Sequence, residues 1–256
     1  MAGTPEETAL ADAVDLPAVA AWLEREVPAC PRPVAAQLIA GGRSNLTFAL
    51  RDAAGGRVIL RRPPVGEVLE SAHDMAREHR ILSALAGTAV PVPQPLGLCG
   101  DPGVIGAPFY VMSFVDGVVV RDQDDAERLL EEPARSRASD AVVDVLADLH
   151  ALDPEAVGLG SLGRHDGYVE RQLRRWQRQW TRSRSFDVPA IDEAHARLSD
   201  RVPPQQRVAI VHGDYRIDNL VLARDGSVAA VLDWELCTLG DPLADLGGLL
   251  VAWIEP

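Results

Sequence analysis

Side chains that could hold a metal ion and accept a proton follow a short apolar segment in the second half of the chain. Asp214 and Asn219 come after the apolar run 208–211, and Asp233 follows Asn219 by fourteen residues. Mg²⁺ takes oxygen ligands such as carboxylates, together with phosphate oxygens and water. Asn219 and Asp233 could supply these oxygens, while Asp214 could accept a proton from a substrate hydroxyl. The set therefore predicts phosphoryl transfer from a magnesium nucleotide.

The segment between the last two of these residues predicts how they meet. Two short apolar runs, 220–222 and 228–232, flank the dipeptide Asp225-Gly226. An Asp-Gly pair in this setting indicates a hairpin with a two-residue turn. The expected cross-strand pairs are Arg224 with Ser227, Leu222 with Ala229, and Leu220 with Val231.

Continuing this ladder would bring Asp233 beside Asp218 and Asn219. The run 208–211 is expected to be a further strand, which delivers Asp214 to the same edge. Each polar residue taken alone also fits an ordinary loop, because Asp and Asn favour turns. The combination with the hairpin spacing favours the nucleotide site.

The motif His-Gly-Asp at 212–214, with Asn219 and Asp233 at these spacings, resembles the aminoglycoside-phosphotransferase-like kinases, which are relatives of the protein kinases. The segment 239–246 is similar to the segment that follows in that family. The resemblance implies that Asp214 is the catalytic base and that Asn219 and Asp233 hold magnesium.

The resemblance extends from about Ile39 to the last residues. It implies an α+β, two-lobed protein-kinase-like fold. The expected N-terminal lobe, residues 1–115, contains an antiparallel sheet and binds the nucleotide, and the mainly helical C-terminal lobe, residues 116–256, is catalytic. ATP or GTP with Mg²⁺ would be the cofactors, and a small molecule that carries a hydroxyl group would be the acceptor.

A finer resemblance concerns this acceptor. Four segments are similar to the kinase-like domain that accompanies acyl-CoA dehydrogenases in some animal proteins, and to its bacterial relatives; they are 60–64, 71–74, 106–112 and 233–235. This similarity implies a hydroxyacyl-CoA as one acceptor. The Arg-rich segment 165–184 fits a docking surface for an anionic substrate, and it also fits a solvated helix face anchored by Trp176 and Trp180.

In the first half of the chain, a glycine-containing interruption separates the apolar runs 35–40 and 46–50. Gly42, Ser44 and Asn45 lie in this interruption. A glycine turn between two strands is the layout of a loop that covers phosphate, because glycine lets the backbone approach a ligand. It is also the layout of a plain hairpin turn. The family has a similar loop, so the resemblance implies that these three residues contact the nucleotide.

The next predicted strand, 57–62, places Ile59 and Arg61 on one face, because side chains alternate along a strand. Ile59 could cover an adenine while Arg61 reaches the phosphates, at a position where the family usually has Lys. Two solvated Arg side chains at a strand end are the alternative. Further on, the backbone of Ser113 and Val115, at a strand end in mid-chain, is expected to bind adenine.

Glu78 interrupts the apolar stripe of a helix predicted over 71–86. Met75, Leu82 and Leu85 form that stripe, at helical spacing. A buried carboxylate needs a partner. Arg61 is the candidate, and a boundary Glu that reaches solvent is the alternative. Another amphipathic core helix is expected over 133–152.

The composition limits the class of protein. The chain has 256 residues, of which 47% are hydrophobic and 25% charged, as in a globular protein with one large or two modest lobes. Its formal net charge of −13 argues against nucleic acid or an anionic membrane as a partner. All 25 basic residues are Arg, so any phosphate contact that related kinases make with Lys would come here from Arg or from the backbone.

Cys30, Cys99 and Cys237 are scattered, which indicates reduced thiols in a cytoplasmic protein. No segment reads as a signal peptide or as a membrane span. The oligomeric state is left open. Family members generally continue with further helices beyond the last residues seen here, so we expect those helices to be missing. A nucleotide-binding protein without transfer activity is therefore the alternative function.

Overall fold

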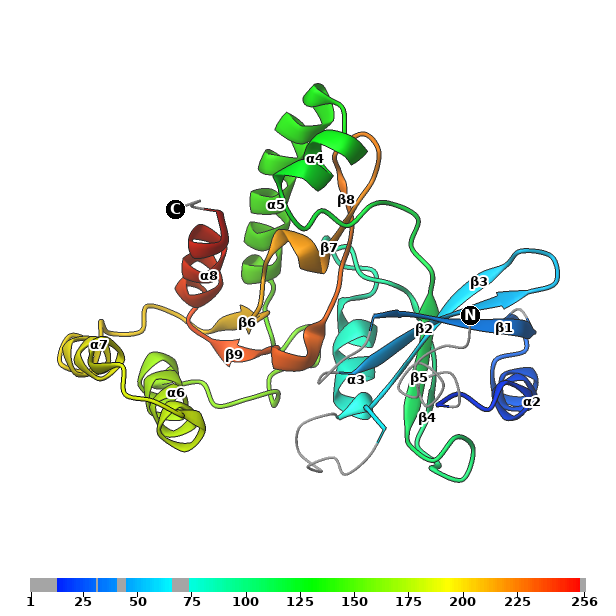
Figure 1. The fold of residues 1–256 in the computed structure, drawn as a ribbon, viewed down its shortest axis with the longest axis horizontal. Coiled ribbons are helices and arrows are strands. Elements are labelled where there is room, and N and C mark those ends of the chain that lie inside the picture. The colour runs from blue at the N-terminus through cyan, green and yellow to red at the C-terminus, as the bar shows by residue number, and fades with distance from the viewer. Residues whose placement is uncertain (1–12, 31, 41–44, 66–73, 254–256) are drawn as a thin grey trace.

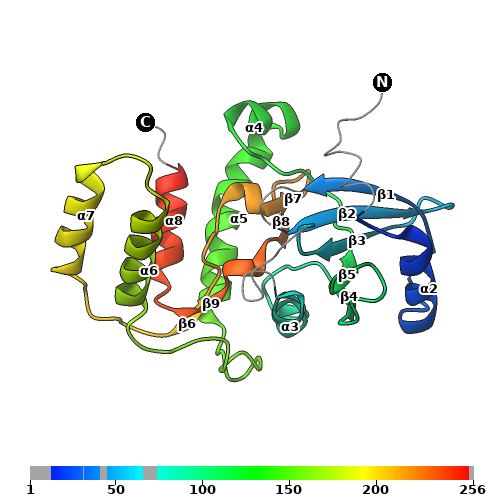
Figure 2. The same cartoon turned by 60° about the horizontal axis from the view of Figure 1, so that its bottom comes forward.

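The computed structural model describes residues 13–30, 32–40, 45–65 and 74–253, which form two parts (Figures 1 and 2). The first part contains α2 (Leu16–Glu26), α3 (Met75–Leu85) and a five-stranded antiparallel sheet in the order β1-β2-β3-β5-β4. Its strands are β1 (Pro33–Ala40), β2 (Leu46–Asp52), β3 (Arg57–Arg62), β4 (Pro95–Cys99) and β5 (Phe109–Ser113).

This sheet separates two apolar cores, because its side chains alternate between the two faces. On one face, Phe48 and Leu60 pack in a cluster with Trp22 of α2. On the other face, Ile59 and Tyr110 belong to a larger core that includes α3 and residues of the second part. The face that carries Ile59 is therefore turned towards the second part.

The starts of α2 and α3 follow from local sequence. Asp15 and Asp74 each precede the first helical residue, and their carboxylates accept hydrogen bonds from backbone amides three residues later, at 3.0 and 2.9 Å. Both are N-caps. The predicted helix over 71–86 is confirmed from Met75 onwards, and its residues 71–73 lie outside the described residues.

The second part is mainly helical, which confirms the α+β class. Its helices are α4 (Gln123–Leu129), α5 (Glu132–Ala151), α6 (Tyr168–Ser183), α7 (Pro189–Ser199) and α8 (Leu243–Trp253). Two small antiparallel sheets pair β6 (Ala209–Val211) with β9 (Thr238–Gly240), and β7 (Leu220–Leu222) with β8 (Val228–Val231). Among the described residues, no helix combines the length and the apolar character that crossing a membrane requires.

The chain passes from the first part to the second after β5. Arg57 of β3 holds this connection, since its Nη2 lies 2.5 Å from Asp116 Oδ1. Val118 then pairs with Leu222 of β7 through two backbone hydrogen bonds of 2.8 Å. The lobe boundary predicted after Val115 falls in this connection, and we propose it as the boundary between the two lobes.

The hairpin β7–β8 forms, but the predicted two-residue turn is wrong. The loop has three residues, 224–226, because the Ala223 amide donates to the Ser227 carbonyl at 2.8 Å. A two-residue type I′ turn requires positive φ at both central residues. Of the described residues other than glycine, Asp233 alone has positive φ, so Asp225 keeps an ordinary conformation and Gly226, at φ 93°, makes the left-handed turn.

The register of the two strands explains why the wrong turn length does not change the predicted alignment at their far ends. Near the turn, Leu222 pairs with Val228 and not with Ala229, whereas Leu220 pairs with Val231 as predicted. The register shifts between these two pairs. One extra residue on β8 therefore forms a bulge that compensates for the longer loop, and the ladder beyond it has the predicted alignment.

We expect Gly226→Ala to destabilise the protein by more than the strain of a positive φ alone would. A Cβ at Gly226 would lie 2.1 Å from the Ala134 carbonyl oxygen of α5, in addition to the positive φ. Gly87 is the matched control, since it has φ 86° and open space around its Cβ position. Gly87→Ala should cost about 1–2 kcal/mol, and Gly226→Ala about 2–5 kcal/mol. Urea unfolding midpoints measure both, and equal costs would contradict the predicted backbone clash.

Candidate functional site

The loop after β6 brings two of the predicted side chains into direct contact. The Asn219 Nδ2 group donates to the Asp214 carbonyl oxygen at 2.9 Å and to its Oδ2 at 3.0 Å. Asn219 is held in this orientation by the short 3₁₀ turn η1 (Ile217–Asn219). Because its amide nitrogen faces Asp214, its amide oxygen is directed away from Asp214.

Asp233 joins them through the hairpin. The Leu232 amide donates to the Asn219 carbonyl at 2.8 Å, so Asp233 is the next residue on the ladder, as the sequence predicted. Asp233 precedes the 3₁₀ turn η2 (Trp234–Leu236) and adopts φ 61° and ψ 65°. Asp tolerates this left-handed conformation better than most residues, and such strain is concentrated at functional sites.

Arg61 lies opposite, at the end of β3. Its Nε is 2.9 Å from Glu78 Oε2, which confirms the predicted ion pair between strand and helix. Its Nη2 also reaches Asp233 Oδ1 at 2.5 Å, and Glu235 Oε2 lies 3.8 Å away. One guanidinium thus connects the sheet, α3 and the end of the hairpin, which suits the planar, multiple-donor geometry of Arg.

Arg61 and the acidic side chains around it shift one another's pKa. Burial alone would lower the pKa of the Arg61 guanidinium, but its interactions with Tyr110, Glu78, Asp233 and Glu235 outweigh burial and raise it. Burial raises the pKa of the Glu78 carboxyl above its ordinary value, although Arg61 and Tyr110 act in the opposite direction. Arg61 therefore stays charged, and three carboxylates share its single positive charge.

Glu78 has two further partners that the sequence did not predict. Asn45 Nδ2 donates to Glu78 Oε1 at 2.6 Å, and the Tyr110 hydroxyl donates to Oε2 at 3.0 Å. The side chain of Asn45 is thus buried against Glu78, and a phosphate contact by this residue stays a prediction. Gly42 and Ser44 lie outside the described residues.

The remaining predicted nucleotide contacts lie at the sheet. Ile59 is buried on the face that carries Arg61, as predicted. The Ser113 amide donates to the Gln94 carbonyl at 2.8 Å, and its Oγ accepts from the Gln94 amide at 2.9 Å. Val115 is half-buried in the connection that follows. Because the Ser113 N–H is already used, an adenine contact by Ser113 would come from its carbonyl, and the backbone contacts of Ser113 and Val115 stay predictions.

Asp245 is a structural support of the loop after β6 that the sequence analysis missed. Its buried carboxylate reaches back from α8 to this loop. Oδ2 accepts from the His212 amide at 2.8 Å and contacts His150 Nε2 at 3.0 Å, and Oδ1 accepts from the Gly213 amide at 2.8 Å. A signal existed, because Asp245 lies one turn from Leu249 on the same buried face, and a buried carboxylate needs partners.

The side chain of His212 was likewise missed. The imidazole is fully buried and packs against Tyr215 and Trp234 with ring centroids 5.9 and 4.7 Å away. Its Nδ1 accepts from the Asp214 amide at 3.2 Å, and its Nε2 lies 2.8 Å from the Leu232 carbonyl. The structure places this ring between the two segments that carry Asp214 and Asp233.

Arg77 was also missed, and it fixes α3 on the second part. Its guanidinium donates to the backbone carbonyls of Glu235, at 3.3 Å, and of Cys237. α3 therefore contacts η2 directly, close to the Arg61–Asp233 pair.

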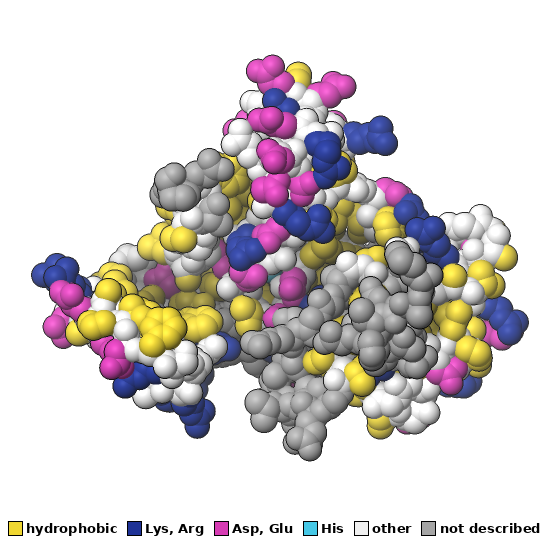
Figure 3. Space-filling view, in the orientation of Figure 1, with side chains coloured by type: hydrophobic (Ala, Val, Ile, Leu, Met, Phe, Trp, Pro, Cys, Tyr) yellow, Lys and Arg dark blue, Asp and Glu magenta, His cyan; other side chains and the backbone are white. Residues whose placement is uncertain are grey.

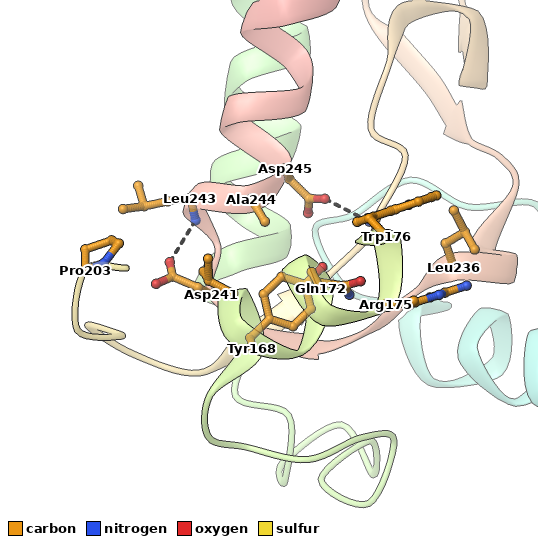
Figure 4. A pocket seen from close by; sticks show the side chains of 12 residues that line it. Tyr168, Gln172, Arg175, Trp176, Pro203, Leu236, Asp241, Leu243, Ala244 and Asp245 are labelled. Carbon is orange, nitrogen blue, oxygen red and sulfur yellow. Dashed lines mark hydrogen bonds between the residues drawn. The ribbon is translucent and has the colours of Figure 1, made fainter. Parts of the chain in front are cut away.

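A cavity of about 350 Å³ lies beside the loop after β6 (Figure 4). Gly213 borders it, next to Asp214, and α6 contributes Tyr168, Arg175 and Trp176. The lining also contains two carboxylates, but both already accept hydrogen bonds. Asp245 accepts from the three donors above, and Asp241 accepts from the Leu243 amide at 3.0 Å, at the start of α8. Arg175 supplies positive charge to the lining.

No group of three or more His, Cys, Asp or Glu side chains is arranged to hold a metal ion by itself in the part of the chain that the structure describes. What the geometry offers is one carboxylate and one amide, Asp233 and Asn219, aligned by the hairpin, with Asn219 in contact with a second carboxylate, Asp214. This donor set fits an ion that takes its other ligands from phosphate and water.

The chain was compared with known proteins. Residues 35–256 match the model of the phosphotransferase enzyme family. Acyl-CoA dehydrogenase family member 10 of Mus musculus is 40% identical over 216 residues, and family member 11 of Gallus gallus is 40% identical over 231 residues. These matches cover 84% and 88% of this chain but 20% and 29% of the relatives, so the chain spans less than a third of their length.

Among solved structures, a protein of Ralstonia eutropha that is described as an aminoglycoside phosphotransferase is 37% identical, with a TM-score of 0.80 over 94% of this chain and 71% of that chain. The GDP complex of aminoglycoside 2′-phosphotransferase-IIIa is 15% identical, with a TM-score of 0.68 over 94% and 79% of the two chains. The second likeness shows the fold alone. The chain therefore belongs to the phosphotransferase enzyme family and has the two-lobed, kinase-like α+β fold that the sequence predicted.

Proposed function

We propose that this protein transfers the γ-phosphoryl group of a magnesium nucleotide, ATP or GTP, to a hydroxyl group of a small molecule. The observation that carries the proposal is the junction of three segments: Asn219 bonds to Asp214, and the Leu232 amide bonds to the Asn219 carbonyl, which aligns Asp233 with them. Several solved relatives of this fold are nucleotide complexes, with GDP or ATP. The likeness supports nucleotide use.

In this proposal, Asn219 and Asp233 hold Mg²⁺ and Arg61 lies near the phosphates. The metal would neutralise charge on the phosphates when it is bound. Asp214 orients the acceptor hydroxyl and takes its proton, because its carboxylate is partly exposed and fixed by Asn219. Ile59 and the backbone of Ser113 and Val115 would contact adenine, and Gly42 and Ser44 would lie over the phosphates.

For the acceptor, we propose an anionic hydroxyl compound such as a hydroxyacyl-CoA. The relatives named as acyl-CoA dehydrogenase family members make an acyl thioester a reasonable candidate. The cavity beside Gly213 would receive the hydroxyl-bearing end (Figure 4). α6 carries five Arg, at 171, 174, 175, 178 and 182, which suits an anionic group. Figure 3 shows apolar side chains gathered over α6 and α7, with basic side chains at the margin.

Arg175→Gln should weaken the binding of the anionic acceptor and leave the affinity for nucleotide unchanged. A hydrogen bond to a charged group contributes about 1.5–3 kcal/mol, so we expect KM for the acceptor to rise roughly tenfold or more. Arg182→Gln is the matched control, because Arg182 lies on the same helix and does not line this cavity. Steady-state kinetics with the acceptor varied checks this, and equal effects of the two changes would remove Arg175 from the acceptor site.

The function itself is tested in two steps. Calorimetry first measures nucleotide affinity with Mg²⁺ and with EDTA. Phosphate transfer from labelled ATP or GTP is then measured over a panel of hydroxylated metabolites, with hydroxyacyl-CoA thioesters, free hydroxy acids and amino sugars as separate arms. Mg²⁺-dependent binding without transfer to any acceptor would instead support a nucleotide-binding protein.

We propose a cytoplasmic location, in accord with the free thiols of Cys30, Cys99 and Cys237.

A further inference from the structure

We infer that Arg77 is a positioning residue, which fixes one wall of the cavity beside Gly213 from the first part of the molecule. Its guanidinium binds the backbone on both sides of Leu236, and Leu236 lines this cavity. The inference rests on the proposed function, since it concerns the cavity that we propose for the acceptor. Arg77 is not among the residues that line the cavity, so it acts on the acceptor through Leu236.

The two acceptors of Arg77 are backbone carbonyls at the end of η2. Its Nη1 donates to the Glu235 carbonyl at 3.3 Å, and its Nη2 donates to the Cys237 carbonyl. The last carbonyls of a helical turn lack partners within that turn, so a cationic donor stabilises them. A planar guanidinium can bind two oxygens in one fixed geometry, which an ammonium group cannot do. Arg77 therefore limits the movement of the backbone before and after Leu236.

Leu236 packs closely against the loop that carries Asp214. A Cβ added to Gly213 would lie 2.9 Å from the Leu236 carbonyl oxygen and 3.0 Å from the Leu236 Cβ. Leu236 also lies at the end of the cavity where Arg175 and Trp176 are found (Figure 4). A shift of η2 would therefore move the cavity wall relative to the side chains that α6 contributes, and would disturb the backbone next to Asp214.

The first part of the molecule holds α3, and so it fixes the position of Arg77. Glu78, the next residue on α3, pairs with Arg61 of β3 at 2.9 Å. Arg61 also contacts Asp233. The segment 233–237 is thus held at its start by Arg61 and at its end by Arg77. Loss of Arg77 would release the end that borders the cavity and would leave Asp233 in place.

Three variants test the inference. Arg77→Gln removes the guanidinium, and Arg77→Lys keeps the charge but cannot hold both carbonyls in a fixed geometry. Arg80→Gln is the matched control, because Arg80 also reaches from α3 to the second part, where it donates to the Gly158 carbonyl at 2.7 Å and to Ser161 Oγ at 2.9 Å. Neither Gly158 nor Ser161 lines the cavity. The control therefore measures the effect of weaker contact between the two parts.

Hydrogen–deuterium exchange of the segment 234–240, in the protein without ligands, gives a measure that does not depend on turnover. Within the turn, the Cys237 amide donates to the Trp234 carbonyl at 3.1 Å, and this bond should open more often once the turn is released. We expect exchange roughly tenfold faster in Arg77→Gln, a smaller increase in Arg77→Lys, and no change in Arg80→Gln. Unchanged exchange in a folded Arg77→Gln variant, or an equal increase in Arg80→Gln, would overturn the inference.

The kinetic test uses a hydroxyacyl-CoA thioester as the acceptor and ATP with Mg²⁺ as the donor. Arg77→Gln should raise KM for the acceptor roughly tenfold, and Arg77→Lys should raise it less. Calorimetry should find the affinity for magnesium ATP within about threefold of the wild-type value, because Arg61 still holds Asp233.

Equal losses of acceptor and nucleotide affinity in Arg77→Gln would overturn the inference, since they would indicate a general disturbance of the fold. If the wild-type protein binds no magnesium nucleotide, the proposed function fails. The exchange results would still decide whether Arg77 holds the backbone around Leu236.

Discussion

Asp214→Asn is expected to lower kcat for phosphate transfer by roughly three orders of magnitude, within the range found for loss of a general base. The amide can still occupy the position that Asn219 fixes, at 3.0 Å from its Nδ2, but it cannot take a proton from the acceptor hydroxyl. Nucleotide affinity should change little, because Asp214 is not one of the proposed metal ligands. Rapid-quench kinetics and calorimetry measure the two quantities separately.

Asp218→Asn is the matched control for this change. Asp218 lies four residues away in the same loop and pairs with Arg216, with one contact of 2.9 Å to Oδ1. The same chemical change there should leave kcat within about threefold, because exposed ion pairs contribute little. Normal turnover by Asp214→Asn would remove this carboxylate from the mechanism, and an equal loss in both variants would point to general disturbance of the loop.

The second large effect is expected from Asp233→Asn, which should reduce the Mg²⁺-dependent affinity for nucleotide roughly 100-fold. Asn is chosen because, like Asp, it tolerates the left-handed backbone at φ 61°, whereas Ala would add strain. The change removes the charge of the proposed metal ligand and weakens the 2.5 Å contact with Arg61. Calorimetry with and without Mg²⁺ separates these effects, because affinity in EDTA should stay within about threefold.

Glu235→Gln is the control, since Glu235 also approaches Arg61, at 3.8 Å, and is not a proposed metal ligand. Its Mg²⁺-dependent affinity should stay close to that of the wild-type protein. A larger loss of Mg²⁺-dependent affinity in Glu235→Gln than in Asp233→Asn would indicate that the metal ion binds nearer to η2. No change in either variant would contradict a metal site at the end of the hairpin.

The local elements could be predicted because they depend on short-range patterns. Helical periodicity identified α3 and α5, and alternation along β3 placed Ile59 and Arg61 on one face. The Asp-Gly dipeptide located the β7–β8 turn, although its length was wrong, because whether Asp225 takes a positive φ depends on the whole loop. The bulge that restored the register also has no clear signal in the sequence.

The ion pair between Arg61 and Glu78 was predictable for a different reason. Glu78 sits in an apolar helical stripe, and a charge in such a stripe requires a partner. The same argument applied to Asp245 and His150 would have indicated that they are partnered, but not with what. Their actual contacts, to each other and to the His212–Gly213 backbone, join three elements that are far apart in the chain.

The sequence by itself determined the residue types of the site and the elements that carry them, because these depend on short-range patterns. It also indicated that a hairpin brings Asp233 near Asn219, but the alignment of the two residues depends on the bulge in β8. Only the tertiary structure decided which supports hold those residues: Asp245 beneath the loop after β6, Tyr110 and Asn45 on Glu78, and the reach of Arg61 across to Asp233. Such partners are chosen by packing between segments distant in the chain, and periodicity along one segment contains no information about its neighbour.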